Sequence, residues 1–372
     1  MKIKFGFNIN FSLFFKLTHR DALKMNLIYM VNNIIKYLAE AGQQAPSADN
    51  SQPWIFVSHD QKLHLFIDLE KIKSSCFNVN HPAILLAMGA VIENILQAAK
   101  WIGVEIELDC CFNPDNGSCA IFHVLEKHNE LPDNAKSHPL FIRCTNRLPF
   151  SNKPIPKQLF DEIAGFSTSN VQILIFQNRE NINQWSKWIR TASEVRFQTP
   201  DVHEWFGQSL KFTPEEISSN EGLNVNTLGL PAMGIRFLKA TQTWERLRFF
   251  NKFGAYKLIA QLESSNIKNS PSLIGFAAPL KNENAIETGR LMERVWIKLN
   301  EVGLSVQPYF VITDQIYRLK QQKVSPEYID MLEDLENKLQ SKIQNRFLYM
   351  LLRVGYCEKH PVKSLRRQVK FQ

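Results

Sequence analysis

The chain of 372 residues has only six cysteines, and no two of them form a C-x-x-C pair. Cys110, Cys119 and His123 come closest to a ligand cluster, but their spacing is not that of a zinc site, so we expect no bound metal. So few cysteines in a long chain are typical of a reducing compartment, which predicts a cytoplasmic protein. The sequence also lacks a G-x-S-x-G elbow and a G-x-G-x-x-G loop, which argues against the hydrolases and nucleotide-binding folds that depend on them.

Long apolar runs are missing as well. The longest, Pro82–Ile92, is too short to cross a bilayer, so we expect no membrane partner. We interpret residues 1–29 as an N-terminal extension without a signal-peptide cleavage site. Met25, or Met30 directly after the extension, could be the true start of the protein. Much of the net charge of +8 lies in the C-terminal tail, but no recognition motif accompanies it, so we expect no nucleic-acid partner.

What the sequence does contain is a pair of similar segments 200 residues apart, an internal repeat that we call the echo. Three residues recur, Gly89 as Gly289, Glu93 as Glu293 and Gly103 as Gly303. The apolar positions between them are in phase, so each segment is predicted to be a core helix closed by a glycine. The length is sufficient for two domains or one fused pseudo-dimer. We therefore expect two tandem lobes, the first over 30–140 and the second over 141–372.

The apolar patterning favours an α+β fold. Besides the two repeat helices, the first over 82–101, it predicts helices over 31–41, 157–164, 185–196 and 326–342. It predicts strands over 55–57, 63–68, 104–108, 120–125, 171–176, 305–313 and 347–354. The segment 198–232 has no counterpart in the first half. Its polar, loop-rich composition is typical of a lid or binding loop.

The most specific local signal is the loop A-P-S-A-D-N-S-Q-P-W over 45–54. Pro46 and Pro53 fix its backbone at both ends, and Ser47, Asn50 and Gln52 supply directional polar groups between them. Such a loop can match the donor and acceptor edge of a uracil-like ring. It can equally be an Asx-type turn that leads into a strand.

A second signal is the basic segment R-C-T-N-R over 143–147. If the segment is extended, Arg143, Thr145 and Arg147 lie on one side, where two guanidinium groups and a hydroxyl suit a phosphate. The alternative is a solvated basic turn. The tail adds Lys363, Arg366 and Arg367 as further anion donors.

Together these motifs resemble those of the FMN-dependent nitroreductase family. Its P-S-x-x-N-x-Q-P-W loop is matched by residues 46–54, and its R-x-[ST]-x-R phosphate motif by residues 143–147. Its late basic segment resembles the tail residues, and its central dimer helix resembles both copies of the echo. The likeness runs from about Val31 to the C-terminus. It implies a nitroreductase-like fold with the cofactor-binding residues Pro46, Ser47, Asn50, Gln52, Arg143, Thr145, Arg147, Lys363, Arg366 and Arg367.

In that family a homodimer binds two FMN molecules, and one subunit supplies the phosphate ligands while the other supplies the P-S-x-x-N loop. This chain carries each element once, in opposite halves. The second-half counterpart of the loop, 166–173, has neither proline nor tryptophan. The resemblance therefore implies a monomeric pseudo-dimer with one FMN between its lobes and an empty second site. No side chain is expected to be catalytic, because the flavin N5 would carry the chemistry.

The chain also resembles a single-chain, two-lobed branch of the family in which a lid covers the flavin, and Asn220–Leu230 looks like that lid. The resemblance implies an oxidoreductase that passes electrons from transiently bound NAD(P)H through FMN to a small nitro or quinone-like acceptor. Two alternatives stay open. One is an FMN-holding protein with a closed lid and little turnover, and the other is a pseudo-enzyme that binds no flavin.

Several single residues have a structural and a functional interpretation. His81 is expected to begin the first repeat helix rather than to catalyse. Cys144 is expected to be a spacer, although neighbouring arginines could lower its pKa. Glu93 and Glu293 could pair between the lobes or take part in chemistry. Trp205, with its neighbour Phe206, is expected to pack the lid rather than stack on the flavin.

Overall fold

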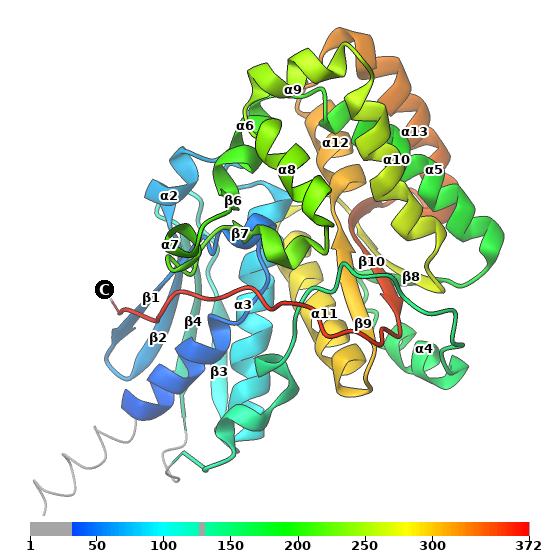
Figure 1. Cartoon of the computed structure of the whole chain (residues 1–372). Coiled ribbons are helices and arrows are strands. Elements are labelled where there is room, and N and C mark those ends of the chain that lie inside the picture. The colour runs from blue at the N-terminus through cyan, green and yellow to red at the C-terminus, as the bar shows by residue number, and fades with distance from the viewer. Residues whose placement is uncertain (1–31, 126–130, 372) are drawn as a thin grey trace, which may run out of the picture.

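The computed structural model describes residues 32–125 and 131–371, so the N-terminal extension 1–29 lies outside the described residues. The chain is a mixed helix and sheet protein. Figure 1 shows one sheet on each side of the long helices α3 (Pro82–Trp101) and α11 (Asn282–Glu301). Further helices cover the second sheet, and residues 198–268 extend over both halves, from beside the first sheet to the second.

The two four-stranded sheets share one strand order. The first contains β1 (Trp54–His59), β2 (Lys62–Ile67), β4 (Ser118–Val124) and β3 (Ile106–Cys110), in that spatial order. The second contains β5 (Gln172–Phe176), β8 (Ser272–Ala278), β10 (Phe347–Gly355) and β9 (Ser305–Tyr309). All neighbours are antiparallel. In each sheet the spatial order is first, second, fourth and third along the chain, and a helix of 20 residues connects the second strand to the third.

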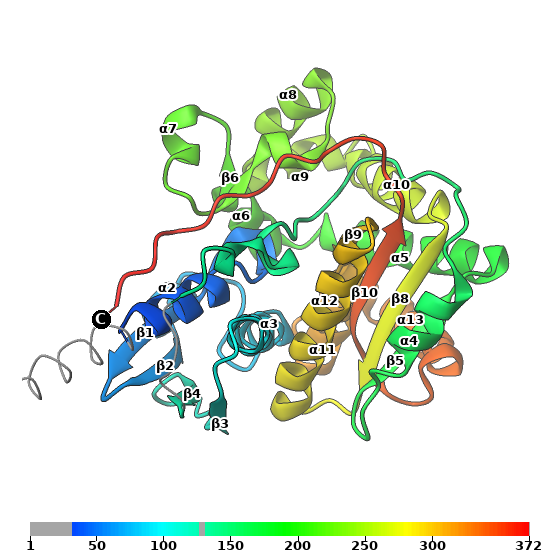
Figure 2. The ribbon, with the colours of Figure 1, turned by 90° about the horizontal axis from the view of Figure 1, so that it is seen from below.

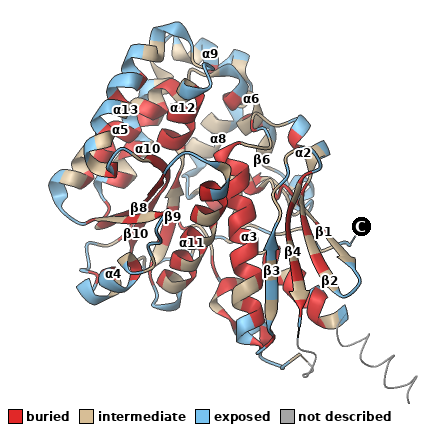
Figure 3. Ribbon diagram, turned by 180° about the vertical axis from the view of Figure 1, so that it is seen from behind, coloured by how far each residue is buried: buried red, intermediate tan, exposed pale blue. Residues whose placement is uncertain are grey.

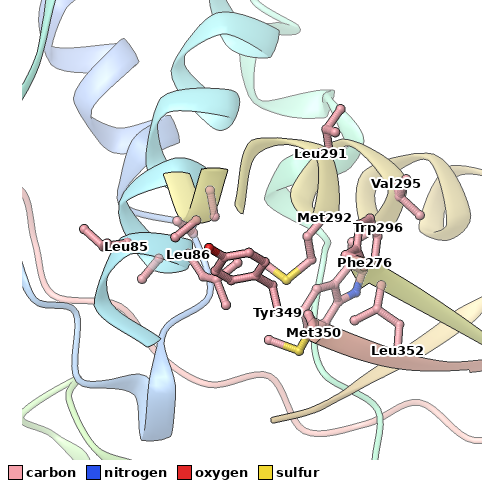
Figure 4. Close-up of a cluster of buried hydrophobic side chains, with 14 of the residues drawn as sticks. Leu85, Leu86, Phe276, Leu291, Met292, Val295, Trp296, Tyr349, Met350 and Leu352 are labelled. Carbon is pink, nitrogen blue, oxygen red and sulfur yellow. The ribbon is translucent and has the colours of Figure 1, made fainter. Parts of the chain in front are cut away.

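The two long helices cross at the glycines of the echo. A Cβ atom on Gly89 would lie 2.0 Å from the carbonyl oxygen of Ile286 and 2.9 Å from the Cα of Gly289. A Cβ atom on Gly289 would lie 2.2 Å from the carbonyl oxygen of Leu86. The backbones therefore touch, and only glycine fits at either position. Figure 4 shows apolar side chains of both helices, including Met292, gathered beside this crossing with those of β8 and β10.

Helix α3 is long and apolar enough to cross a membrane by length and composition, and it is the one such helix among the described residues. The sequence-based argument considered only the shorter run Pro82–Ile92 and missed this property. However, 89% of the apolar window is buried inside the fold. In Figure 3, α3 and α11 form a continuous buried strip between the sheets. The apolar composition of α3 is therefore explained by its packing between the sheets.

The remaining elements complete the layers. A helix over 32–42 precedes the first sheet and buries Ile34, Ile35, Leu38 and Ala41, as predicted. The other α-helices are α2 (Leu69–Lys73), α4 (Lys157–Ala164), α5 (Arg179–Arg196), α6 (Pro200–Ser209), α7 (Pro214–Ile217), α8 (Ala232–Ala240), α9 (Trp244–Asn251), α10 (Ala255–Lys268), α12 (Val311–Lys320) and α13 (Ile329–Ile343). Short 3-10 helices are η1 (Ala48–Asn50), η2 (Ala135–Ser137), η3 (Pro139–Phe141), η4 (Val225–Leu228) and η5 (Pro326–Tyr328), and β6 (Leu210–Lys211) pairs with β7 (Leu223–Asn224).

Three sequence predictions about elements were wrong. The segment 198–232 is not mainly loop, because it contains α6, α7 and η4, and it is followed by three more helices that were not predicted. Strand β8 was also missed, because its continuous apolar run lacks the alternation of a half-buried strand and it is buried on both faces. The strand predicted over 305–313 ends at Tyr309, and α12 begins at Val311.

The C-terminal tail returns to the first half of the chain. Figure 2 shows it, in red, leaving β10 and running past the long helices to the edge of the first sheet. There Phe371 forms an isolated parallel bridge with Phe56 of β1. The end of the tail therefore lies beside the first sheet although it follows the last strand of the second.

Candidate functional site

The loop over 45–54 is a strained turn. Asp49, Asn50 and Gln52 have φ angles of 46°, 57° and 50°. Such left-handed backbone is uncommon outside glycine, and it is often found at functional sites. Ser47 follows Pro46, and its hydroxyl accepts a hydrogen bond from the backbone amide of Gln52 at 2.9 Å, which closes the turn. Ser47 thus has the structural role of a turn residue, whereas the buried amide side chains of Asn50 and Gln52 reach beyond the loop to other segments.

Those two amide groups contact the insertion and the tail. Asn50 Nδ2 donates to the carbonyl oxygens of Gly222 and Leu365, both at 3.0 Å. Gln52 Nε2 donates to the carbonyl oxygen of Asn220 at 2.8 Å. The segment that resembled a lid therefore covers the loop and occupies its donors.

Three cations, Arg143 and two from the C-terminal tail, converge on Gln44. The backbone oxygen of Gln44 accepts hydrogen bonds from Arg143 Nη2 at 2.7 Å and from Arg366 Nη2 at 3.4 Å. Its side-chain oxygen accepts from Lys363 Nζ at 3.4 Å. Arg366 also reaches the proline-bounded loop, because its Nη1 donates to Asn50 Oδ1 at 2.8 Å. We call Arg143, Lys363 and Arg366 the cation cluster.

Only one carboxylate faces the cation cluster among the residues that the structure describes. Glu293 of α11 is fully buried, and its Oε1 lies 2.7 Å from Arg143 Nε. The geometry of this contact is not that of a hydrogen bond. Neither carboxylate oxygen of Glu293 accepts a hydrogen bond. Burial raises the pKa of Glu293 to about 7, against the opposing effect of Arg143 and Arg366. The Arg143 guanidinium also stacks on the ring of Trp296, 4.6 Å away.

The cluster is short of negative charge, and its pKa values reflect this. Burial, followed by repulsion from Arg143 and Arg366, lowers the pKa of Lys363 to about 8. Burial and Arg143 lower the pKa of Arg366 to about 9. The Arg366 side chain is only half-buried overall. Its Nε atom, however, is fully buried and has no hydrogen-bond partner. Such a group of cations is stabilised by an anion bound among them.

The pKa of the Cys144 thiol is raised, whereas the sequence suggested that neighbouring arginines could lower it. Arg143, Lys363 and Arg366 do lower the pKa of its thiol, but burial is the larger effect and raises it overall. The Cys144 thiol is therefore protonated at neutral pH, as a spacer residue would be.

The R-x-T-x-R segment is not a regular strand, so its side chains do not share one side. Thr145 forms only an isolated parallel bridge with Val306. Whereas Arg143 lies in the cation cluster, Arg147 Nη1 donates to the carbonyl oxygen of Thr227 at 3.2 Å. The nearby carboxylate of Asp49 opposes the lowering of the Arg147 pKa by burial. Arg147 therefore holds the insertion.

Arg367 also lies outside the cation cluster. Its backbone amide donates to Gln52 Oε1 at 2.9 Å, and its guanidinium donates to the carbonyl oxygen of Gln52. Its Nε lies 3.7 Å from Glu221, which pairs with Lys71 at 2.6 Å. Arg367 thus fastens the tail to the loop and to the insertion.

The two glutamates of the echo have different partners. Glu93 of α3 binds Arg294 of α11 through hydrogen bonds of 2.7 and 3.0 Å, which is a pairing role between the two halves. Glu293 instead faces Arg143. The second-half counterpart of the loop is likewise engaged elsewhere, since Thr168 Oγ1 and Asn170 Nδ2 both donate to Glu287.

The other single residues have the structural roles that were expected. His81 caps α3, because its Nδ1 accepts the amide hydrogen of Ala83 at 3.1 Å. The ring of Trp205 packs edge-on against Phe77 at 4.8 Å. No group of three or more metal-binding side chains is present in residues 32–125 and 131–371.

Sequence reasoning missed three residues of the site. Gln44 accepts from all three cations, and its neighbour Gln43 accepts a hydrogen bond from Trp54 at 2.9 Å and donates to Gln52. The signal was the pair of glutamines at a helix end directly before the loop. Trp296 was not predicted, because nothing in the sequence distinguishes it from an ordinary core residue.

The space beside the loop is small. A cavity of about 10 Å³, on the scale of one water molecule, is lined by Asn50, Lys211, Ile217, Asn220, Glu221, Gly222, Asn224 and Leu365. Small-molecule sites usually have about 300 Å³ or more. A ring system can enter next to Asn50 and Gln52 only if the segment around Asn220–Gly222 moves away.

No family model matches the chain. Among curated proteins, the chain is similar to the uncharacterized protein MT1398 of Mycobacterium tuberculosis, with 24% identity over 277 residues, which are 73% of this chain and 38% of that protein. It is also similar to the putative NAD(P)H nitroreductase acg of the same organism, with 28% identity over 133 residues, 34% of this chain and 38% of that protein. The chain thus spans less than two fifths of the length of these relatives.

Solved structures show weak similarity. One is the FMN-dependent nitroreductase NfnB from Mycobacterium smegmatis in complex with NADPH, with 12% identity and a TM-score of 0.33, covering 60% of this chain and 87% of that one. Another is a nitroreductase with bound FMN from Desulfitobacterium hafniense, with 8% identity and a TM-score of 0.34, covering 62% and 93%. A nitroreductase-like family protein from Bacillus cereus has 11% identity and a TM-score of 0.33, covering 66% and 94%.

Proposed function

We propose that this chain is an FMN-binding oxidoreductase of nitroreductase type that takes electrons from NAD(P)H and passes them to a small nitro or quinone-like acceptor. The observation that carries the proposal is the cation cluster. Arg143, Lys363 and Arg366 meet around Gln44 and face a single carboxylate whose pKa is about 7. A phosphate monoester, with a charge near −2 at neutral pH, would neutralise these cations.

The two ends of the site fit FMN to different degrees. At the phosphate end, the unpartnered buried Nε of Arg366 is a free donor for an anion. At the ring end, Asn50 and Gln52 have the amide groups that an isoalloxazine edge requires, but backbone carbonyls of the insertion and tail occupy them. FMN binding would therefore require residues 220–230 to open. We propose that this segment is a lid within the insertion 198–232.

We also propose that the chain is a tandem duplication, an intramolecular pseudo-dimer with lobes over 30–140 and 141–372. The equal strand order of the two sheets and the glycine crossing of α3 and α11 support this. Glu93 and Glu293 have diverged, since only Glu293 faces an arginine of the cation cluster. This asymmetry supports one FMN per chain, and we also propose that the protein is a cytoplasmic monomer.

The residues that would hold FMN divide by position. Arg143, Lys363 and Arg366 would bind the phosphate, and Asn50 and Gln52 would orient the ring. Pro46, Ser47 and Thr145 would shape the backbone around them, and Arg147 and Arg367 would position the lid and the tail. When bound, FMN would supply the hydride chemistry at its N5, and the protein would supply binding, orientation and exclusion of water.

An anaerobic absorbance experiment tests the proposed function. We expect purified protein reconstituted with FMN to show a flavin band that bleaches when NADPH or NADH is added. A band that bleaches only with dithionite would instead favour the FMN-holding alternative with a closed lid. Failure to retain FMN at any concentration would support the pseudo-enzyme alternative and contradict the proposal. A variant in which a glycine-serine linker replaces residues 220–230 tests whether the lid limits the rate.

The depressed pKa of Lys363 predicts a pH dependence of FMN binding. A free-protein pKa of about 8 means that Lys363 loses its proton, and its attraction for phosphate, as the pH rises through 8. Bound phosphate would raise that pKa, so the titration of Lys363 alone should increase the dissociation constant of FMN about tenfold from about pH 7 to about pH 9. Equilibrium titration at constant ionic strength measures this change.

The control for this prediction is Lys363→Arg, which keeps its charge at high pH. The pKa of Glu293 is about 7. As the pH rises, the ionised carboxylate of Glu293 repels the phosphate, so it also weakens FMN binding. The variant should therefore lose the change that Lys363 contributes around pH 8 and keep the changes due to Glu293 and to Arg366, whose pKa is about 9. An unchanged profile in Lys363→Arg would show that Lys363 does not contact the phosphate.

A further inference from the structure

The helices α8, α9 and α10 form a surface with unusually exposed apolar side chains. We call residues 231–268 the α8–α10 face. Met233 is 75% exposed, Phe249 is 56% exposed and Phe253 is 78% exposed. Leu258 and Leu262, one turn apart on α10, are each 60% exposed. Helix α8 has no fully buried residue at all. Single exposed apolar residues are common, but a set of this size on one segment indicates an interaction surface.

The aromatic side chains of this face are in contact with one another. Phe237 of α8 packs against Phe250 of α9, with ring centroids 6.0 Å apart. Phe250 packs against Phe249 at 5.7 Å, and Phe249 packs against Phe253 at 5.6 Å. The rings therefore form one continuous apolar strip. It ends at Phe253, in the turn that Gly254 makes with a φ of 85°.

The same face is strongly basic. It has seven Lys or Arg residues and only two Glu residues. All seven cations are exposed, namely Arg236, Lys239, Arg246, Arg248, Lys252, Lys257 and Lys268. Glu263 points inward, where it accepts a hydrogen bond from Ser193 at 2.6 Å and lies 3.6 Å from Arg196. Glu245 is thus the one exposed acid among these described residues.

We propose that the α8–α10 face binds the surface of an anionic lipid bilayer, with Phe249 and Phe253 inserted between the headgroups. Apolar and aromatic side chains surrounded by Lys and Arg are the composition of interfacial membrane-binding segments. Figure 2 shows α8 and α9 projecting from the side of the molecule away from both sheets. A bilayer would contact this projecting surface without reaching the sheets.

The charge and the shape favour a bilayer over other occupants. A second copy of this chain would bring the same seven cations face to face, which costs free energy. A groove for an acidic helix would partly enclose its apolar residues, but side chains exposed to 75% and 78% stand above the surface. The sequence-based expectation of no membrane partner considered only spanning segments, and the proposal concerns peripheral contact.

Sedimentation with vesicles tests the proposal on the full chain. The vesicles are phosphatidylcholine alone and phosphatidylcholine mixed with phosphatidylglycerol. We expect binding to the mixed vesicles only, weakened by added salt. The variant Phe249→Ser/Phe253→Ser should bind at least about tenfold more weakly, because it loses the inserted apolar area. The variant Lys252→Gln/Lys257→Gln should lose about tenfold through lost attraction.

Matched controls lie on other faces of the molecule. Val302→Ser/Met331→Ser removes two apolar side chains that are each 42% exposed, and Lys157→Gln/Lys359→Gln removes two exposed cations. Both should bind like the unmodified protein, and circular dichroism checks that every variant is folded. The proposal is wrong if the protein does not bind the mixed vesicles, or if the α8–α10 variants bind as well as the controls. It is also wrong if ultracentrifugation shows a dimer that Phe249→Ser/Phe253→Ser abolishes.

Discussion

Replacing Arg366 by glutamine is expected to weaken FMN binding about a hundredfold. Arg366 donates to both Asn50 and Gln44, and its buried Nε has no partner. A charge-assisted hydrogen bond to phosphate in such a site contributes about 2–3 kcal/mol, which corresponds to about a hundredfold in the dissociation constant. Quenching of flavin fluorescence during titration of FMN-free protein measures the change.

The neighbouring residue provides the control for Arg366. Arg367→Gln removes the same charge from the same tail, but Arg367 contacts Glu221 and the Gln52 backbone. We expect its effect to stay below about fivefold, because no direct phosphate contact is lost. Equal losses in the two variants would mean that the tail acts only through its overall charge or fold. The cation cluster would then not be the phosphate site.

Replacing Gly89 by alanine is expected to destabilise the protein by about 4 kcal/mol or more. The new methyl group would lie 2.0 Å from the carbonyl oxygen of Ile286, so the two long helices must separate. The clash is with backbone atoms, which cannot rotate away as a side chain can. Separation of the helices also loosens the apolar packing between the sheets. Gly289→Ala should have a similar effect, with 2.2 Å to Leu86. Urea denaturation followed by circular dichroism gives the free energy of unfolding.

A second glycine inside a helix controls for helix propensity. In α8 a Cβ atom on Gly234 would have its nearest neighbour, Leu230, at 3.4 Å, an ordinary contact. Gly234→Ala should be neutral or stabilise the protein by up to about 1 kcal/mol. If Gly89→Ala unfolds at the same urea concentration as Gly234→Ala, the helices do not cross at their glycines.

Much of the fold could be predicted from sequence where local patterns agree with packing. The repeat helices, the hairpin of β1 and β2, and α4 were predicted because apolar periodicity and turn residues act locally. Strand β8 and helices α8–α10 were missed. The former has no alternation because it is buried on both faces, and the latter keep their apolar residues exposed, which reverses the usual pattern.

The candidate site was predictable in its residue types but not in its pairings. Asn50 and Arg143 were singled out by their motifs, and Lys363 and Arg366 by the basic composition of the tail. The structure brings all four together around Gln44. Spacing could not tell that Arg147 and Arg367 hold the insertion and the tail instead, because this depends on contacts between residues 80 or more positions apart. The role of Glu293 as counter-ion is equally long-range.

The convergence of Asn50, Arg143 and Arg366 within one chain has a consequence for how the site assembles. No collision between two molecules is needed to bring these groups together, so assembly is a first-order process. Dilution, which separates the halves of a site shared between subunits, leaves this one intact. Its occupancy then depends on ligand concentration alone, down to amounts of protein at which a dimer would dissociate.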